Sequence, residues 1–330
     1  MSKNQTRLAN RSTNVSFLAR YWLAFMFVVL LVIFGVLEPN FLKATNLLNI
    51  FSSACLTAIA GIGMTCIMSS GEMDFAAGTE LSLGAASMAW IMTETPVKNY
   101  FIALFITFCL LAIFGLLNAF LHVRIGIPAF IATLGTSYIF RGIIKGFVSV
   151  GSINGVEKGG KKIFTFLGQK YVAGIIPMPV IVLLIISIVM MVYTERTRSG
   201  RFLYAVGSNK EACKYIGIEA NKEKIKGFLL CAFFCGFAGI VQGSMLNGCT
   251  ATMGDAMLTQ GLTVLMLGAS FFKLGVYNIP GTIVASLLLS MISNGMTMTN
   301  VSNSGRDFIQ AVILLFAVTL VTWLRRRINK

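Results

Sequence analysis

The chain has little charge and almost no histidine. Only 12% of its 330 residues are charged, whereas 56% are hydrophobic, and His122 is the single histidine. A soluble α/β protein interrupts its apolar stretches with charge far more often, so this composition excludes an ordinary soluble domain. Acidic residues are the scarcer charge, with 12 Asp and Glu against 27 Lys and Arg. Because the basic residues gather in loops and at the ends of apolar runs, they argue against a nucleic-acid-binding protein.

The sequence also lacks the patterns of a metal site and of a catalytic centre. Seven cysteines lie mostly in apolar runs, none forms a CxxC pair, and one histidine cannot complete a zinc site. We interpret the cysteines as small buried hydrophobic residues. The segment 155–162 spaces Gly and Lys as a phosphate-binding loop does, but Lys162 stands where that loop needs Ser or Thr. We therefore predict no metal, no cofactor and no enzymatic activity.

Long apolar runs dominate the chain, and about 20 apolar residues cross a bilayer. They predict an all-α polytopic membrane protein with about ten transmembrane helices, some of them broken or re-entrant. No cleavable signal is expected, because Met1–Arg20 is polar and basic and no small-residue cleavage site follows the first run. The predicted spans are 19–37, 50–70, 75–92, 100–121, 127–148, 174–194, 226–246, 256–272, 279–297 and 306–324.

The basic residues predict the orientation of these spans. Ten spans place both termini on one side, and putting that side in the cytosol collects most of the Lys and Arg there, as the positive-inside rule requires. The predicted parts are a cytoplasmic tail (1–18), a transmembrane domain (19–324) that contains a long cytoplasmic loop (195–226), and a second cytoplasmic tail (325–330).

One loop departs from this rule. Residues 149–173 fall outside, yet they carry Lys158, Lys161, Lys162 and Lys170. Either the fifth segment is a re-entrant hairpin or the loop is an exported basic surface, and we favour the exported surface.

Two polar interruptions break the apolar spans. The segment 71–80 holds Glu72, Asp74 and Glu80, and an ionised acid at the bilayer centre costs about 2.5–3.5 kcal/mol. Asp74 either caps the following helix or belongs to a broken helix whose polar end faces a translocation path. In the fifth span, Arg141 either snorkels to the outer surface or pairs with an acid. Small residues elsewhere predict close helix packing, at Gly61, Gly63, Gly78, Gly84, Gly236 and Gly239.

The cytoplasmic loop 195–226 is expected to contain a short capped helix. Ala212 and Ile216 lie four residues apart and therefore share one apolar face of it. A membrane protein that presents such a face in the cytosol is suited to receive force from another protein. Ser208 or Asn209 is expected to cap the start of the helix, and Gly217 to close its end. Glu211 in the first turn and Lys214 in the last turn carry the charges that the helix dipole favours.

Three motifs follow one another along the chain: Gly71–Gly78, Ile127–Gly135 and Thr197–Gly207, the last running into Glu211 and Ala212. Together they resemble the membrane permease subunits of binding-protein-dependent ABC importers of the ribose/galactose type, over nearly the whole chain. The resemblance implies a bacterial plasma-membrane protein with one cytoplasmic coupling helix. It also implies three partners: a cytoplasmic ABC ATPase, a second permease subunit and an extracytoplasmic sugar-binding protein.

Candidate functional residues fall into three sets. The resemblance implies that the ATPase docks on Gly207, Glu211, Ala212, Ile216 and Gly217. Sparse polar residues in the spans are candidates for the path of a sugar, although each is also an ordinary interhelical hydrogen-bonding residue: Asp74, Asn118, Thr133, Ser137, Gln242, Asn247 and Asn294. The exported lysines, Lys158, Lys161 and Lys162, are candidates for docking the binding protein.

The chain departs from the family pattern in the eighth span, where Leu258 and Gln260 replace two acids. This leaves the substrate open, and with it the choice between an identical and a different partner permease. The nearest alternative is a permease for branched-chain amino acids or nucleosides. A secondary transporter would need a proton or sodium relay, and a membrane-embedded enzyme would need a reactive constellation that the sequence lacks.

Overall fold

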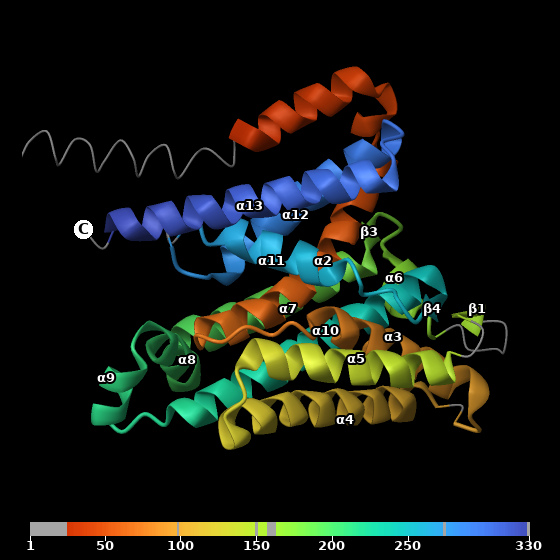
Figure 1. Cartoon of the computed structure of the whole chain (residues 1–330). Helices are drawn as coiled ribbons and strands as arrows, with labels where there is room; N and C mark the ends of the chain where they lie inside the picture. Colours follow the sequence, from red (N-terminus) through yellow and green to blue (C-terminus); the bar gives the residue numbers. More distant parts are fainter. Residues whose placement is uncertain (1–24, 98, 149–150, 157–162, 273–274, 329–330) are drawn as a thin grey trace, which may run out of the picture.

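The computed structural model describes residues 25–97, 99–148, 151–156, 163–272 and 275–328, and most of them are helical (Figure 1). Within these residues, each predicted span has a matching helix, which confirms the all-α polytopic fold. The helices are Phe25–Leu37, α2 (Ala44–Ser69), α3 (Ala77–Glu94), α4 (Tyr100–Ala119), α5 (Ala129–Phe147), α7 (Met178–Arg196), α10 (Ala220–Leu246), α11 (Met257–Gly268), α12 (Ile279–Met298) and α13 (Asn303–Ile328).

Among the described residues, five helices are long and apolar enough to cross a membrane: α2, α4 with the π-helical turn η2 (Phe120–Ile125), α7, α10 and α12. By contrast, α11 has 12 residues, about 18 Å at the usual helical rise, against a hydrocarbon core of about 30 Å. The eighth predicted span is therefore a broken one. The 19 residues of α5 form one continuous helix, so the alternative of a re-entrant hairpin at the fifth segment is wrong.

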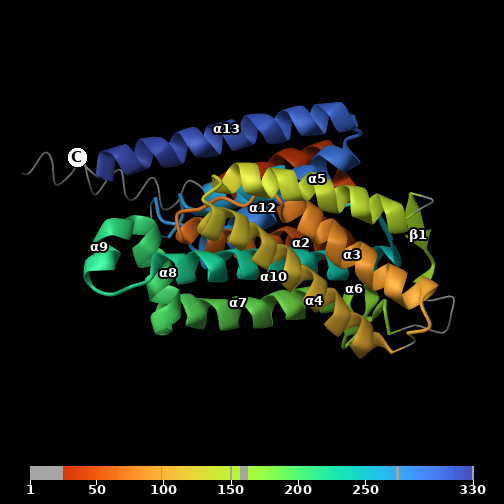
Figure 2. The same ribbon diagram turned by 60° about the horizontal axis from the view of Figure 1, so that its bottom comes forward.

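Short elements gather at the two ends of the bundle. The antiparallel pair β1 (Ser152–Asn154) and β4 (Gly248–Thr250) lies at one end, with α6 (Phe166–Gln169) and the hairpin of β2 (Tyr171–Val172) and β3 (Ile176–Pro177). The helices α8 (Arg198–Ser208) and α9 (Lys210–Tyr215) lie at the opposite end in both views (Figures 1 and 2). The 3-10 turn η1 (Pro39–Leu42) precedes α2.

The long helix α10 is the centre of the packing, because it contacts α2, α3 and α4. A Cβ atom added to Gly84 of α3 would overlap the carbonyl oxygen of Gly236 in α10, and one added to Gly239 would overlap that of Leu81. These glycines let the two backbones touch, as the small-residue pattern predicts. Close packing of this kind replaces the hydrophobic effect as the source of helix association inside a bilayer.

Replacing Gly84 with alanine tests this contact. Because the added methyl group meets backbone rather than a movable side chain, Gly84→Ala should destabilise the protein by about 1–3 kcal/mol. The matched control is Gly146→Ala in α5, where an added Cβ meets no atom within 4 Å. The measurement is the thermal unfolding temperature of the purified protein in detergent. Equal unfolding temperatures for Gly84→Ala and the wild type would contradict the contact.

Candidate functional site

The helix α9 begins with a side-chain cap. The Asn209 side-chain oxygen accepts a hydrogen bond of 2.9 Å from the backbone N–H of Ala212. Ser208, the other candidate, instead donates to the carbonyl oxygen of Tyr204 at 2.9 Å, within α8. Of the two predicted caps, Asn209 is therefore the one that forms. Glu211 lies in the first turn, where its negative charge interacts favourably with the positive end of the helix dipole.

The same helix ends as its glycine predicts. Gly217 has a φ of +77°, a conformation that glycine adopts without steric cost. The N–H of Ile218 donates to the carbonyl oxygen of Cys213 at 2.9 Å, and the N–H of Gly217 donates to that of Lys214 at 3.2 Å. This pair of bonds is a Schellman motif, which satisfies two carbonyl groups that the short helix would leave open.

Most of α9 faces outward. Cys213 is its buried residue, whereas Glu211 and Ala212 are exposed and Tyr215 and Ile216 are 89% and 73% exposed. A surface that combines exposed aromatic and aliphatic side chains with charges is typical of a protein docking site. The predicted coupling face is therefore accessible, and its role in docking stays a prediction.

The preceding helix α8 was not expected from the sequence. Thr197 caps it by accepting a 3.1 Å hydrogen bond from the N–H of Gly200, while Leu203 and Val206 are buried beneath it. The sequence does contain two signals of this helix, the Thr197 cap and the apolar residues three positions apart. The many charged residues around them made the segment look like a loop. A cavity of about 750 Å³ opens beside α8, between α7 and the start of α12.

Gly207, near the end of α8, presses against the turn between α2 and α3. A Cβ atom added to Gly207 would overlap the carbonyl oxygen of Ser69, and one added to Gly71 would lie 3.3 Å from the Gly207 Cα. Tyr204 is packed at the same junction, where burial raises the pKa of its phenol to about 12 and so keeps it neutral. Only a glycine at this position allows α8 to lie so close to the membrane helices.

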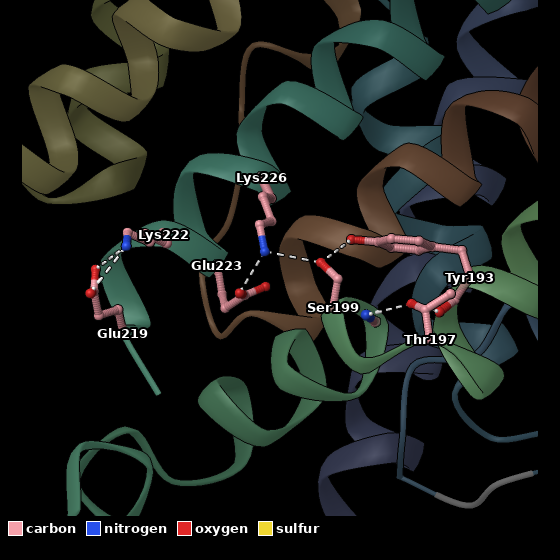
Figure 3. Close-up of polar contacts among 8 residues, drawn as sticks. Tyr193, Thr197, Ser199, Glu219, Lys222, Glu223 and Lys226 are labelled. Atoms are coloured by element: carbon pink, nitrogen blue, oxygen red, sulfur yellow. Dashed lines mark hydrogen bonds and ion pairs between the residues drawn. The ribbon is translucent and has the colours of Figure 1, made fainter. Parts of the chain in front are cut away.

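A chain of polar contacts fixes the root of α8 (Figure 3). Lys226 of α10 donates to Glu223 at 2.7 Å and to the Ser199 hydroxyl at 3.0 Å, and that hydroxyl bonds the Tyr193 phenol of α7 at 3.0 Å. The side chains thus join α7, α8 and α10 at one place. As a result, α8 is held by side chains at its start and by backbone contact near its end.

A second polar cluster lies at the α2–α3 turn itself. Lys224 of α10 forms an ion pair with Glu72, and the His122 Nε2 lies 3.1 Å from the same carboxylate. The His122 Nδ1 donates to the carbonyl oxygen of Ile127 at 2.9 Å, because a carbonyl oxygen can only accept. These contacts tie the turn to α10 and to the end of α4. Glu72 stood out in the sequence, but its two partners did not.

Three of the predicted path residues lie close to this turn. Asp74 accepts a 2.8 Å hydrogen bond from the N–H of Ala76, the residue just before α3, so it shapes the turn rather than capping the helix. Thr133 of α5 accepts from the Phe75 N–H at 3.0 Å. One turn further along α5, Thr136 donates to Asn118 of α4 at 2.5 Å.

The other path candidates are spread through the bundle. Ser137 donates to a carbonyl within its own helix at 2.7 Å, and Asn294 pairs with Asn46 through two 3.0 Å hydrogen bonds. Gln242 lies near the end of α10, and Asn247 closes that helix with a φ of +53°. The seven residues therefore do not meet in one place, and their role in a path stays a prediction.

The remaining predicted residues are Arg141, Leu258 and the three lysines of the loop after α5. Arg141 of α5 forms an ion pair with Asp255, so of its two predicted fates pairing with an acid is the one observed. Leu258, one of the departures from the family pattern, packs on the main hydrophobic cluster. The docking candidates Lys158, Lys161 and Lys162 lie outside the described residues.

Comparison with known proteins places this site in a family. Residues 46–318, from α2 into α13, match the family described as the permease component of branched-chain amino acid transport systems. The chain belongs to this permease family. The match covers α8, α9 and the α2–α3 turn, so the contacts described above lie inside the shared permease region.

Several curated permeases are similar over most of their length. The ribose import permease RbsC of Escherichia coli K12 is 29% identical over 292 residues, which cover 88% of this chain and 90% of that one. The D-allose permease AlsC of the same strain is 27% identical over 304 residues, 91% of each chain. The galactose/methyl galactoside permease MglC is 25% identical over 314 residues, 89% and 92% of the two chains. No solved structure matches the chain.

Replacing the residues of the Glu72–Lys224 pair tests the tie between the turn and α10. Removing Lys224 leaves the largely buried Glu72 carboxylate with only the His122 ring beside it, so Lys224→Leu should cost about 3 kcal/mol, the lower end of the range for breaking a buried ion pair. Replacing both residues by leucine should recover most of that loss, because no buried charge remains. Unfolding in detergent measures both effects, with the single variant Glu72→Leu completing the cycle. Losses that simply add would show that the two side chains do not interact.

Proposed function

We propose that this chain is the membrane permease subunit of an ABC importer for a sugar of the ribose/galactose class. A binding protein delivers the sugar, and a separate ATPase subunit supplies the energy, so the chain itself has no catalytic role. Support comes from the permease family and from relatives whose names specify ribose, allose and galactose import. A homodimer and a heterodimer of permease subunits are both compatible with this proposal.

The observation that carries the proposal is that α9 is exposed but firmly anchored to the membrane helices through α8. It is capped at both ends, most of its side chains are exposed, and it follows directly on α8, which is fixed at both of its ends. A helix anchored in this way transmits displacement, because force on its outer face is not lost in a flexible loop. The ATPase is the partner that such a displacement requires.

A mechanical route runs inward from α9. Closure of the ATPases on ATP moves α9, which carries α8 with it through Asn209: its side chain caps α9, and its backbone N–H donates to the Ala205 carbonyl oxygen of α8 at 3.0 Å. The end of α8 presses on the α2–α3 turn at Gly207, and the Glu72–Lys224 pair passes the movement to α10. Because α10 contacts α2, α3 and α4, a tilt of α10 shifts the centre of the bundle and opens the path alternately to each side.

The proposed path suits a neutral, hydroxylated solute. Its candidate residues, which include Thr133, Asn118 and Asn294, carry hydroxyl and amide groups, which are uncharged hydrogen-bonding groups. Weak contacts of this kind let a sugar pass without holding it, and selectivity then belongs to the binding protein. The second candidate substrate is a branched-chain amino acid, which the family description favours.

The decisive test of coupling is a bulky substitution on the exposed face of α9. Ala212→Trp should abolish sugar uptake in proteoliposomes containing the whole importer, because the indole ring separates α9 from the ATPase. Ala212→Ser is the matched control and should leave uptake near the wild-type rate, since it adds one small hydroxyl group. Both variants should insert and unfold as the wild type does, because Ala212 is exposed. Wild-type uptake by the Trp variant would refute the docking role of α9.

The exported lysines generate a separate test of receptor docking. Replacing Lys158, Lys161 and Lys162 together with glutamate should weaken stimulation of the ATPase by the binding protein, because the proposed partner face is acidic. The charge-preserving replacement of all three by arginine is the control and should retain stimulation. The measurement is ATPase activity of the reconstituted importer against the concentration of binding protein. An unchanged response in the glutamate variant would remove these residues from the docking surface.

A further inference from the structure

An acid and two thiols meet where α3 packs on α10. Glu80 of α3 is completely buried, and neither of its carboxylate oxygens has a hydrogen-bond partner among the described residues. The Sγ atoms of Cys231 and Cys235, on successive turns of α10, lie 3.9 Å apart. One carboxylate oxygen and the two sulfur atoms all lie within 4.8 Å of one another.

The charge balance of this cluster is incomplete. Within the described part of the chain, no Lys or Arg forms an ion pair with Glu80, whereas Glu72 in the same segment has Lys224. The side chain of Asp74 lies beside Glu80, so the two carboxylates repel each other when both are ionised, whereas a shared proton would join them. A buried carboxylate without hydrogen bonds is rare unless a cation or a proton neutralises it.

We propose that Glu80, Cys231 and Cys235 form a binding site for a thiophilic divalent cation of the zinc class, which joins α3 to α10. Two sulfur atoms, each about 2.3 Å from a tetrahedral zinc ion, are about 3.8 Å apart, close to the spacing observed here. Both cysteines are free, and thiolate with carboxylate is a donor set that zinc accepts. As each metal–sulfur bond forms, the thiol releases its proton to solution.

This site escapes the usual search for metal motifs, and it revises the expectation of no metal site. The two cysteines are four apart on one helix rather than in a CxxC turn, and the third ligand, Glu80, precedes Cys231 by 151 positions in the chain. The helix brings residues i and i+4 to one face, and packing of α3 on α10 adds the acid. A bound ion would clamp the helix that follows the α2–α3 turn to the centre of the bundle.

The test uses the purified full-length chain with Cd²⁺ as the probe, because cadmium bound to thiolates gives an ultraviolet charge-transfer band. The exposed Cys109 is replaced by serine in every protein, so that it does not contribute. Cys231→Ser, Cys235→Ser and Glu80→Gln are compared with the matched control Cys55→Ser, which removes a buried thiol of α2 outside the cluster. Zn²⁺ competition, followed by measurement of bound metal, gives the stoichiometry and the affinity.

The expected result is one ion per chain in the parent and in Cys55→Ser, with affinity reduced more than about tenfold in each cluster variant. Zn²⁺ should also raise the unfolding temperature of the parent but not that of the cluster variants, which separates binding from any folding defect. Absence of tight binding in the parent would overturn the proposal and favour a protonated Glu80 that donates to a neighbouring group. Binding unchanged in Glu80→Gln would also overturn it, because a dithiol alone would then hold the ion.

Discussion

The backbone contact between α3 and α10 is the constraint on which the rest of the structure depends. Inside a bilayer no water competes for apolar surface, so helices are held by close packing rather than by exclusion from solvent. Gly84 and Gly239 allow that packing, because a Cβ atom added to either would overlap a backbone carbonyl oxygen of the facing helix. The same long helix α10 carries Lys224 and Lys226 in its first turns, where Lys226 bonds Ser199 of α8. One helix therefore joins the densest packing to the polar end of the bundle.

The helices α8 and α9 depend on this arrangement for their rigidity. An exposed six-residue helix is too short to be stable in water by itself. It persists because its caps satisfy its ends, because Cys213 is buried, and because α8 is fixed beneath it by Gly207 and by the Ser199–Lys226 contact. Without these anchors, a helix as short and exposed as α9 would not be rigid. A helix that docks on a partner protein, as proposed for α9, needs to be both exposed and rigid.

The sequence predicts those features that depend on local chemistry. The apolar runs give every membrane helix, and Asn209 and Gly217 give both ends of α9, because span length and capping are set by neighbouring residues. For features that depend on pairing between distant residues, the sequence did not identify the partners. Lys224 and His122 meet Glu72 only because α10 and α4 converge there, and Asp255 meets Arg141 from 114 positions away. The seven path candidates are spread through the bundle for the same reason, since polarity alone does not place residues together, and their role stays a prediction.

The two acids of the 71–80 segment show how burial separates residues that look alike in sequence. Glu72 lies in the turn, near the end of the bundle, where Lys224 forms an ion pair with it and the His122 ring lies beside it. Glu80 lies one turn inside α3, where its described neighbours offer two thiols and the repulsion of Asp74. The first environment suits a fixed ion pair that ties the turn to α10. The second offers no positive charge within the described residues, so Glu80 needs either a bound proton, which makes it neutral, or a bound cation, which balances its charge.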